Sequence, residues 1–121
     1  MQNYTFSKTY KRKNNKKFIL IVDDDKNIRF ILKTLFAKNN YQVETTGNLA
    51  GLHRLINNFS PDLIITDVKL PDGNFFSVIP NIKKQYPNLP IIIISAFSTL
   101  STAVKAVRHG AFEFISNPFD I

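Results

Sequence analysis

FILIVDDDKNIRFILKTLF (residues 18–36) is the stretch that decides the fold class. It opens with five consecutive apolar residues, a pattern typical of a strand buried in a sheet. Three aspartates follow, and apolar residues then recur at helical intervals: Ile28, Ile31, Leu32, Leu35 and Phe36. The stretch therefore predicts a buried strand, an acidic loop and an amphipathic helix.

Short apolar runs and longer helical patterns continue to alternate along the chain. Further strands are predicted over residues 41–46, 62–67, 90–95 and 112–115, and helices over 48–58, 75–86 and part of 95–110. Strands of unbroken Ile, Leu and Val that are separated by helices are what a parallel sheet covered on both faces requires. We expect a doubly wound α/β fold. A fifth helix should follow Asp120, but the sequence stops at Ile121, so we interpret the chain as a fragment or a domain of a longer protein.

The helix predicted over residues 75–86 is less regular, because it contains Pro80. Proline is poorly tolerated inside a helix but acceptable in the first turn, where its missing N–H has no helical partner. We therefore expect the regular helix to begin late, with Ser77 as its N-cap.

The composition indicates one globular domain. The chain has 121 residues and no cysteine, which excludes disulfides and thiolate metal sites. It contains no apolar run near eighteen residues and no secretory signal pattern. We expect a soluble protein with no membrane contact, and by default a cytoplasmic one.

The positive charge belongs to the N-terminal tail. Six of the sixteen basic residues lie within residues 1–17, so ten basic residues face nine acids from Phe18 onward, and only +1 of the net +7 remains there. We expect residues 1–17 to form a basic, disordered leader and residues 18–121 to form the domain. A weak contact between this leader and nucleic acid or an acidic partner is the alternative.

Oxygen-bearing side chains stand where the predicted strands end. Asp23 and Asp24 follow the first strand, Asp67 ends the third, Ser95 ends the fourth and Asn117 follows the fifth. In sheets of this type, function collects at the carboxyl ends of the strands. Carboxylates gathered there repel one another unless a counter-charge is present, and Mg²⁺ prefers such oxygen ligands. The pattern predicts a magnesium site.

Four segments in order resemble the receiver domain of two-component response regulators: ILIVDDDKNIR (19–29), DLIITDVKLPDG (62–73), PIIIISAFS (90–98) and GAFEFISNPFDI (110–121). The resemblance runs from Phe18 to the end of the chain. The last two segments look most like receivers that precede ATPase-type transcription activators. The resemblance implies a flavodoxin-like, five-stranded parallel sheet of order 2-1-3-4-5.

The resemblance also implies a role for each site residue. Asp67 would be the phosphoacceptor, attacking the phosphohistidine of a sensor histidine kinase. Asp23 and Asp24 would hold Mg²⁺ together with Asp67 and the backbone carbonyl of Lys69. Such a domain catalyses only its own phosphorylation and dephosphorylation, and is otherwise not an enzyme.

The response to phosphorylation would pass through two further residues. Ser95 would donate a hydrogen bond to the phosphoryl group, and Phe114 would then rotate inward and change a protein-interaction surface. The resemblance implies an output domain, DNA-binding or ATPase, outside this chain and a role in transcription control. It leaves a homodimer open.

The chain departs from the family pattern at two places. Asn117 stands where the family has lysine, and three aspartates with one Mg²⁺ sum to −1, which an amide cannot neutralise. Phe75 stands where the family usually has glycine, which suggests an altered loop beside the site. We expect Lys69 to compensate in part, and Lys69 and Phe97 to hinder the approach of water to the phosphoryl group.

Several alternatives stay open at this point. Asp25 suits a helix N-cap better than a metal ligand, Phe114 fits an ordinary core aromatic, and Lys69 fits a solvent-exposed lysine. His53 and His109 fit surface positions. The whole chain could be a degenerate receiver that binds partners without phosphorylation. An aspartate-nucleophile phosphatase is disfavoured, because such enzymes need a second acid where Lys69 stands.

Overall fold

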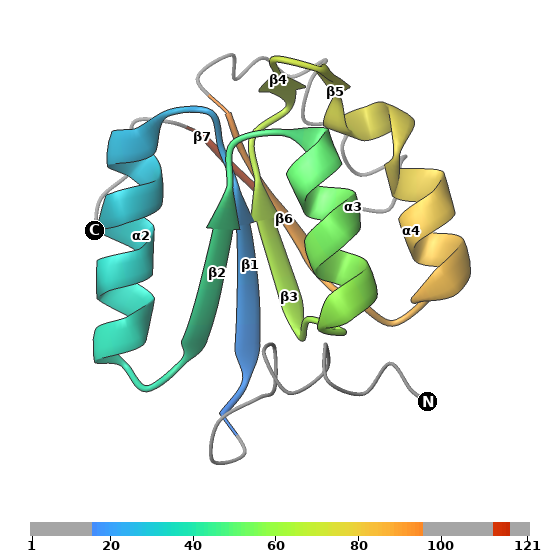
Figure 1. The fold of residues 1–121 in the computed structure, drawn as a ribbon. Helices are drawn as coiled ribbons and strands as arrows, with labels where there is room; N and C mark the ends of the chain where they lie inside the picture. The colour runs from blue at the N-terminus through green and yellow to red at the C-terminus, as the bar shows by residue number, and fades with distance from the viewer. Residues whose placement is uncertain (1–15, 96–112, 117–121) are drawn as a thin grey trace.

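The computed structural model describes residues 16–95 and 113–116. The elements run in the order β1 (Phe18–Val22), α2 (Lys26–Lys38), β2 (Gln42–Thr46), α3 (Leu49–Asn58), β3 (Leu63–Thr66), β4 (Lys69–Leu70), β5 (Gly73–Asn74), a 3₁₀ turn (Phe75–Ser77), α4 (Ile79–Gln85), β6 (Ile91–Ser95) and β7 (Glu113–Ser116). Figure 1 shows their arrangement.

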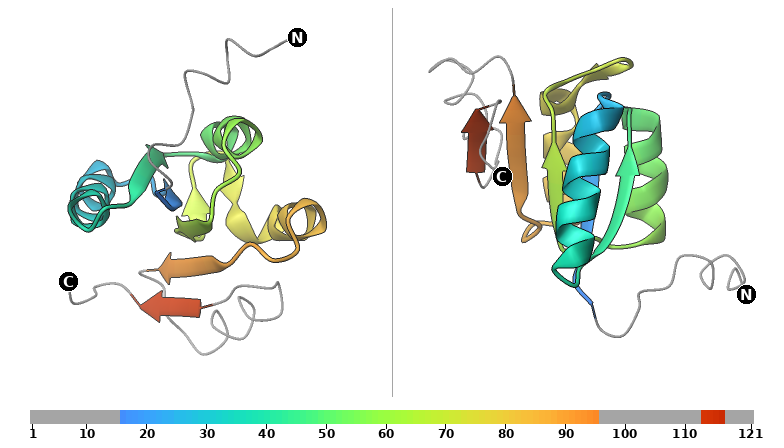
Figure 2. Two further views of the ribbon diagram at one scale, coloured as in Figure 1. Left: turned by 90° about the horizontal axis from the view of Figure 1, so that it is seen from below. Right: turned by 90° about the vertical axis from the view of Figure 1, so that its left-hand side faces the viewer.

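Five strands form one parallel sheet in the order β2-β1-β3-β6-β7. Strands β4 and β5 form a separate hairpin. When the five strands of the main sheet are numbered in chain order without them, the sheet order is 2-1-3-4-5, and the predicted order is confirmed. Helix α2 covers one face of the sheet, and α3 and α4 cover the other (Figures 1 and 2). The fifth helix and the helix predicted within residues 95–110 lie outside the described residues.

The two faces of β1 belong to two different cores. Phe18, Leu20 and Val22 pack in a cluster with side chains of α3 and α4, whereas Ile19 and Ile21 pack with Leu32 of α2. All five β1 residues are buried. This explains why the strand is apolar throughout rather than alternating, as a central strand between two helical layers requires.

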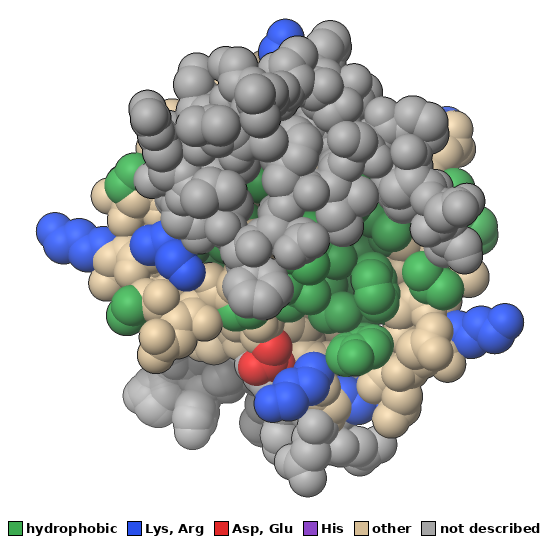
Figure 3. Space-filling view, turned by 180° about the vertical axis from the view of Figure 1, so that it is seen from behind, with side chains coloured by type: hydrophobic (Ala, Val, Ile, Leu, Met, Phe, Trp, Pro, Cys, Tyr) green, Lys and Arg blue, Asp and Glu red, His purple; other side chains and the backbone are tan. Residues whose placement is uncertain are grey.

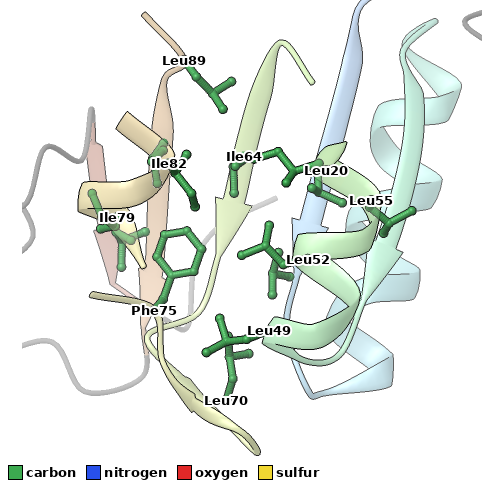
Figure 4. Close-up of a cluster of buried hydrophobic side chains, with 14 of the residues drawn as sticks. Leu20, Leu49, Leu52, Leu55, Ile64, Leu70, Phe75, Ile79, Ile82 and Leu89 are labelled. Carbon is green, nitrogen blue, oxygen red and sulfur yellow. The ribbon is translucent and has the colours of Figure 1, made fainter. Parts of the chain in front are cut away.

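A short antiparallel hairpin follows β3, where the sequence analysis expected only a turn-rich loop. Lys69 pairs with Asn74 and Leu70 with Gly73, which has a φ of +148° that disfavours other residues. Phe75, the departure from the family's glycine, directly follows β5 and is fully buried in the cluster drawn in Figure 4.

The start of α4 corrects one prediction. Ser77 is not the N-cap: the helix begins at Ile79 after Val78, which provides no side-chain cap. The Ser77 hydroxyl instead donates to the Asn74 carbonyl at 2.7 Å and closes the preceding 3₁₀ turn. Pro80 lies in the first turn of α4, as expected.

An apolar groove of about 930 Å³ lies at the amino ends of the central strands. Ile19, Leu63 and Ile92 line it from the sheet and Phe36 lines it from α2. Figure 3 shows hydrophobic side chains gathered on the molecular face turned away from the viewer of Figure 1. Since the carboxyl ends of the strands lie at the opposite edge, this groove is separate from the predicted acidic site.

In the described part of the chain, no helix is long and apolar enough to span a bilayer.

Candidate functional site

Three carboxylates meet at the carboxyl edge of the sheet. Asp23, Asp24 and Asp67 each offer an oxygen, and these oxygens lie within 4.8 Å of one another. The sheet positions them: the Asp23 N–H donates to the Thr46 carbonyl at 3.0 Å, and the Asp67 N–H donates to the Val22 carbonyl at 2.9 Å. The strand ladder thus continues one residue beyond β1 and β3 and places the aspartates side by side.

Asp23 is the most buried member of the cluster, with 5% of its surface exposed. Burial raises the pKa of its carboxyl from 3.8 to about 6; a hydrogen bond from the Asp25 N–H opposes this, and the charges of Asp67 and Asp24 add to it. That hydrogen bond joins Asp25 N to Asp23 Oδ1 at 2.9 Å. Ionising the Asp23 carboxyl therefore costs more free energy in the folded protein than in water.

Asp67 is half-buried. Burial raises its pKa, the Val68 N–H lowers it and the charge of Asp24 raises it. The Val68 N–H donates to Asp67 Oδ1 at 2.7 Å, so this oxygen is already engaged. The N–H and the positive charge of Lys69 also lower the pKa of Asp67, although the Lys69 side chain is exposed. Lys69 therefore places some positive charge near the predicted phosphoacceptor.

Arg29 contributes a cation that the sequence analysis missed. Its Nη1 donates to the Asp23 carbonyl at 2.6 Å. A Cβ at Gly47 would come within 2.9 Å of the same nitrogen, so glycine leaves room for the guanidinium. Arg29 lies four residues after Asp25, on α2. This spacing could have placed Arg29 near the acidic loop, but the contact with Gly47 depends on the fold.

The cluster matches the needs of a hard divalent cation. Its ligand atoms are all oxygens, the pKa values of Asp23 and Asp67 are raised, and the Asp23 carboxylate is nearly inaccessible to water. Burial and mutual repulsion of this kind are relieved when a cation such as Mg²⁺ binds. Asp23, Asp24 and Asp67 therefore fit the magnesium site expected from the sequence.

Asp25 does not belong to this group. Its side chain accepts a hydrogen bond from Asn27 N–H at 2.8 Å and caps α2, which confirms the capping interpretation. His53 is exposed on α3, as expected.

The remaining predicted residues lie at or beyond the edge of the described structure. Thr66 stands opposite Ile93, and Ser95 stands opposite Ser116, so the backbones of Asp67 and Ser95 reach the same edge of the sheet. Phe114 lies in β7 opposite Ile93. Asn117, Phe97 and His109 lie outside the described residues.

These observations define a class of protein: a doubly wound α/β domain with an acidic cluster at the carboxyl edge of its parallel sheet. Residues 19–121 match the family model described as "Response regulator receiver domain". The chain belongs to this family.

Named relatives place the chain further within the family. It is 50% identical over 103 residues to the DNA-binding transcriptional regulator NtrC of Azospirillum brasilense, covering 85% of this chain and 21% of that protein. The receiver domain of NtrX from Brucella abortus is similar in structure, with 33% identity, a TM-score of 0.78 and coverage of 84% and 87%. The beryllofluoride-activated NtrC4 receiver domain dimer has 32% identity, a TM-score of 0.80 and coverage of 85% of each chain.

The chain spans about a fifth of the length of the curated relatives that it matches. These relatives are transcriptional regulators of the kind that the sequence resemblance indicated. The family is one of signalling domains within two-component response regulators.

Proposed function

We propose that the chain is the phosphoacceptor receiver domain of a two-component response regulator, with Asp67 as the residue phosphorylated by a histidine kinase. The observation that carries this proposal is the convergence of Asp23, Asp24 and Asp67 oxygens within 4.8 Å at the end of the parallel sheet. A family resemblance alone could belong to a chain that has lost its site, but here all three carboxylates are present and adjacent.

Asp67 is poised as the nucleophile. Its Oδ1 accepts the Val68 N–H, and we assign to its other oxygen, Oδ2, the attack on the phosphorus of a phosphohistidine. A bond forms between Oδ2 and phosphorus while the phosphorus–nitrogen bond to imidazole breaks, and the imidazole nitrogen keeps the electron pair and later takes up a proton. The half-buried position limits the water that could compete with Asp67.

Asp23, Asp24, Asp67 and the backbone carbonyl of Lys69 would hold Mg²⁺. When bound, Mg²⁺ supplies positive charge that offsets both the carboxylates and the phosphoryl oxygens. Asp23 has a fixed place in this arrangement, because its backbone carbonyl is held by Arg29 and its Oδ1 by Asp25 N–H.

Within residues 16–95, Arg29 and Lys69 place positive charge near the site. Arg29 contacts the backbone of Asp23, and Lys69 lowers the pKa of Asp67. We propose that they replace part of the charge that Asn117 cannot supply. Lys69 and Phe97 would also hinder water at the phosphorylated site.

The output is proposed to follow the family pattern. Ser95 would hydrogen-bond the phosphoryl group and Phe114 would respond by rotating, which alters a surface read by an output domain that controls transcription, DNA-binding or ATPase in kind. The proposed setting is the cytoplasm. A homodimer is included because the similar NtrC4 receiver is a dimer when activated by beryllofluoride. The basic leader over residues 1–17 remains a prediction, as does its weak contact with nucleic acid.

Beryllofluoride, a phosphoryl analogue, offers a direct test. With Mg²⁺ present it should raise the melting temperature of the wild-type protein, and Asp67→Asn should remove this shift. Mg²⁺ and fluoride without beryllium provide the control. If wild type and Asp67→Asn respond alike, Asp67 is not the acceptor.

A degenerate receiver is the second candidate, and Asn117 is the observation that favours it. That function predicts partner binding and transcriptional output that are unchanged by Asp67→Asn. The phosphoacceptor function predicts that the same substitution abolishes the stimulated output.

A further inference from the structure

The tip of the β4–β5 hairpin is fastened to the N-terminus of α3. Asp72 lies in the turn between the two strands, and its Oδ1 accepts the Leu49 N–H at 2.8 Å while its Oδ2 accepts the Ala50 N–H at 3.0 Å. These donors are among the first-turn N–H groups that a helix cannot satisfy internally. They lie 23 and 22 positions away along the chain, so Asp72 joins two segments that are remote in sequence.

Helix α3 also has a local cap. Asn48 Oδ1 accepts the Gly51 N–H at 2.7 Å, as an ordinary N-cap does. Asp72 therefore does not replace a missing cap. It adds a connection between the hairpin and the helix.

Apolar contacts also hold the hairpin against α3. Leu70 and Leu49 are both buried in the same cluster, and Figure 4 shows their side chains close together. A Cβ at Gly73 would come within 2.9 Å of Leu49 Cδ1, so the hairpin backbone lies directly against this leucine. Phe75 is fully buried at the end of the hairpin.

Two hydrogen bonds and one cross-strand pair connect the hairpin to the acidic site. The Phe75 N–H donates to the Val68 carbonyl at 2.8 Å, and Lys69 pairs with Asn74 across the two strands. Val68 in turn donates its N–H to Asp67 Oδ1 at 2.7 Å. The backbone on which Lys69 sits is thus tied at one end to Asp67 and at the other, through Asp72, to α3.

We propose that Asp72 is a positioning residue for the acidic site, which acts through the hairpin to hold the backbone of Lys69 in one place beside Asp67. This inference rests on the proposed function, in which the Lys69 carbonyl is a metal ligand. If the hairpin is looser, the Lys69 carbonyl occupies a range of positions. Binding the cation must then fix this carbonyl in one position, and that cost lowers the affinity for the cation.

Isothermal titration of the protein with MgCl₂ tests the proposal. Asp72→Ala should weaken Mg²⁺ affinity by about threefold to tenfold, less than the loss that direct outer-shell partners of a metal give. Asp72→Asn should weaken it less, because the amide oxygen can still accept one of the two hydrogen bonds. Both variants remove the same charge, so the difference between them reports the hydrogen bonds.

Asn48→Ala is the matched control. It weakens the N-terminus of the same helix but leaves the hairpin connection in place, so Mg²⁺ affinity should stay within about twofold of wild type even though both alanine variants lose a comparable cap. Equal affinities for Asp72→Ala and wild type would overturn the proposal. So would equal losses in Asp72→Ala and Asp72→Asn, or in Asp72→Ala and Asn48→Ala.

Hydrogen exchange separates this proposal from the proposed function. Asp72→Ala should speed exchange of the Phe75 amide, and Asn48→Ala should not. If the wild-type protein fails to bind Mg²⁺, the proposed function is wrong, and the exchange rate of the Phe75 amide then shows by itself whether Asp72 holds the hairpin in place. An unchanged exchange rate of the Phe75 amide in Asp72→Ala would overturn the positioning role of Asp72, whether or not the metal binds.

Discussion

Replacing Asp23 by asparagine is expected to stabilise the metal-free protein. Burial holds the pKa of this carboxyl at about 6 instead of 3.8, so the folded state disfavours the charged form that exists at pH 7. At 1.36 kcal/mol per pKa unit this difference corresponds to about 3 kcal/mol, and screening by water at the open edge of the site reduces the expected gain to about 1–2 kcal/mol. Asparagine keeps the Oδ1 that accepts the Asp25 N–H.

The gain should depend on pH in a defined direction. Between pH 3.8 and about 6 the folded state holds a proton on Asp23 that the unfolded state has released. Stabilisation from this proton is complete below pH 3.8 and is lost as the pH rises through about 6. The wild-type protein should therefore match Asp23→Asn most closely at the acidic end of this range, and the advantage of the variant should be largest above it.

Urea unfolding followed by circular dichroism measures this effect. In EDTA at pH 7, Asp23→Asn should have the higher midpoint. Saturating Mg²⁺ should raise the wild-type midpoint, because a ligand that binds only the folded state stabilises it, and should leave the variant nearly unchanged. Asp25→Asn is the control, since Asp25 is exposed and asparagine also caps helices, and it should change neither value much. A metal-free Asp23→Asn that is less stable than wild type at pH 7 would refute the reasoning.

Three further predictions concern single side chains. Arg29→Met removes the 2.6 Å hydrogen bond to the Asp23 carbonyl, and should lower the free energy of unfolding in urea by about 1–2 kcal/mol; a change close to zero would show that the bond is not stabilising. Phe75→Ala empties a fully buried position, and should lower the same free energy by about 3–5 kcal/mol, whereas a loss below about 1 kcal/mol would mean that the hairpin collapses onto the space. Asn117→Lys restores an ammonium, and should speed phosphorylation of Asp67 by acetyl phosphate; an unchanged rate would show that charge at this position does not limit the reaction.

The centre of the sheet could be predicted because β1, β3 and β6 each contain a run of three or more consecutive apolar residues. All five residues of β1 are apolar and buried, and β6 has four consecutive isoleucines before Ser95, so neither shows the helical spacing of apolar and polar residues. The cluster of Asp23, Asp24 and Asp67 followed from the same pattern, since parallel strands bring their carboxyl ends to one edge. Local chemistry alone was also sufficient for the Asp25 cap and for Pro80 in the first turn of α4.

What the sequence could not predict depends on contacts between distant segments. Strands β4 and β5 have two residues each, too few to show an alternating pattern. Asp72 reaches the N-terminus of α3 only because the hairpin packs against Leu49 of that helix. Arg29 has room for its guanidinium only because Gly47, beside it, has no side chain. Ser77 has a good capping side chain, but its hydroxyl bonds to Asn74 within the preceding turn, so the helix starts after it.

The mass of the intact protein after incubation with acetyl phosphate and Mg²⁺ tests the central claim most directly. The account predicts that wild type gains the mass of one phosphoryl group, that EDTA prevents the gain, and that Asp67→Asn shows none while Asp25→Asn still does. If Asn117→Lys gains the phosphoryl mass and the wild-type protein under the same conditions does not, Asn117 is what prevents phosphorylation of the wild-type protein. Phosphorylation of Asp67→Asn to the same extent as wild type would contradict the account.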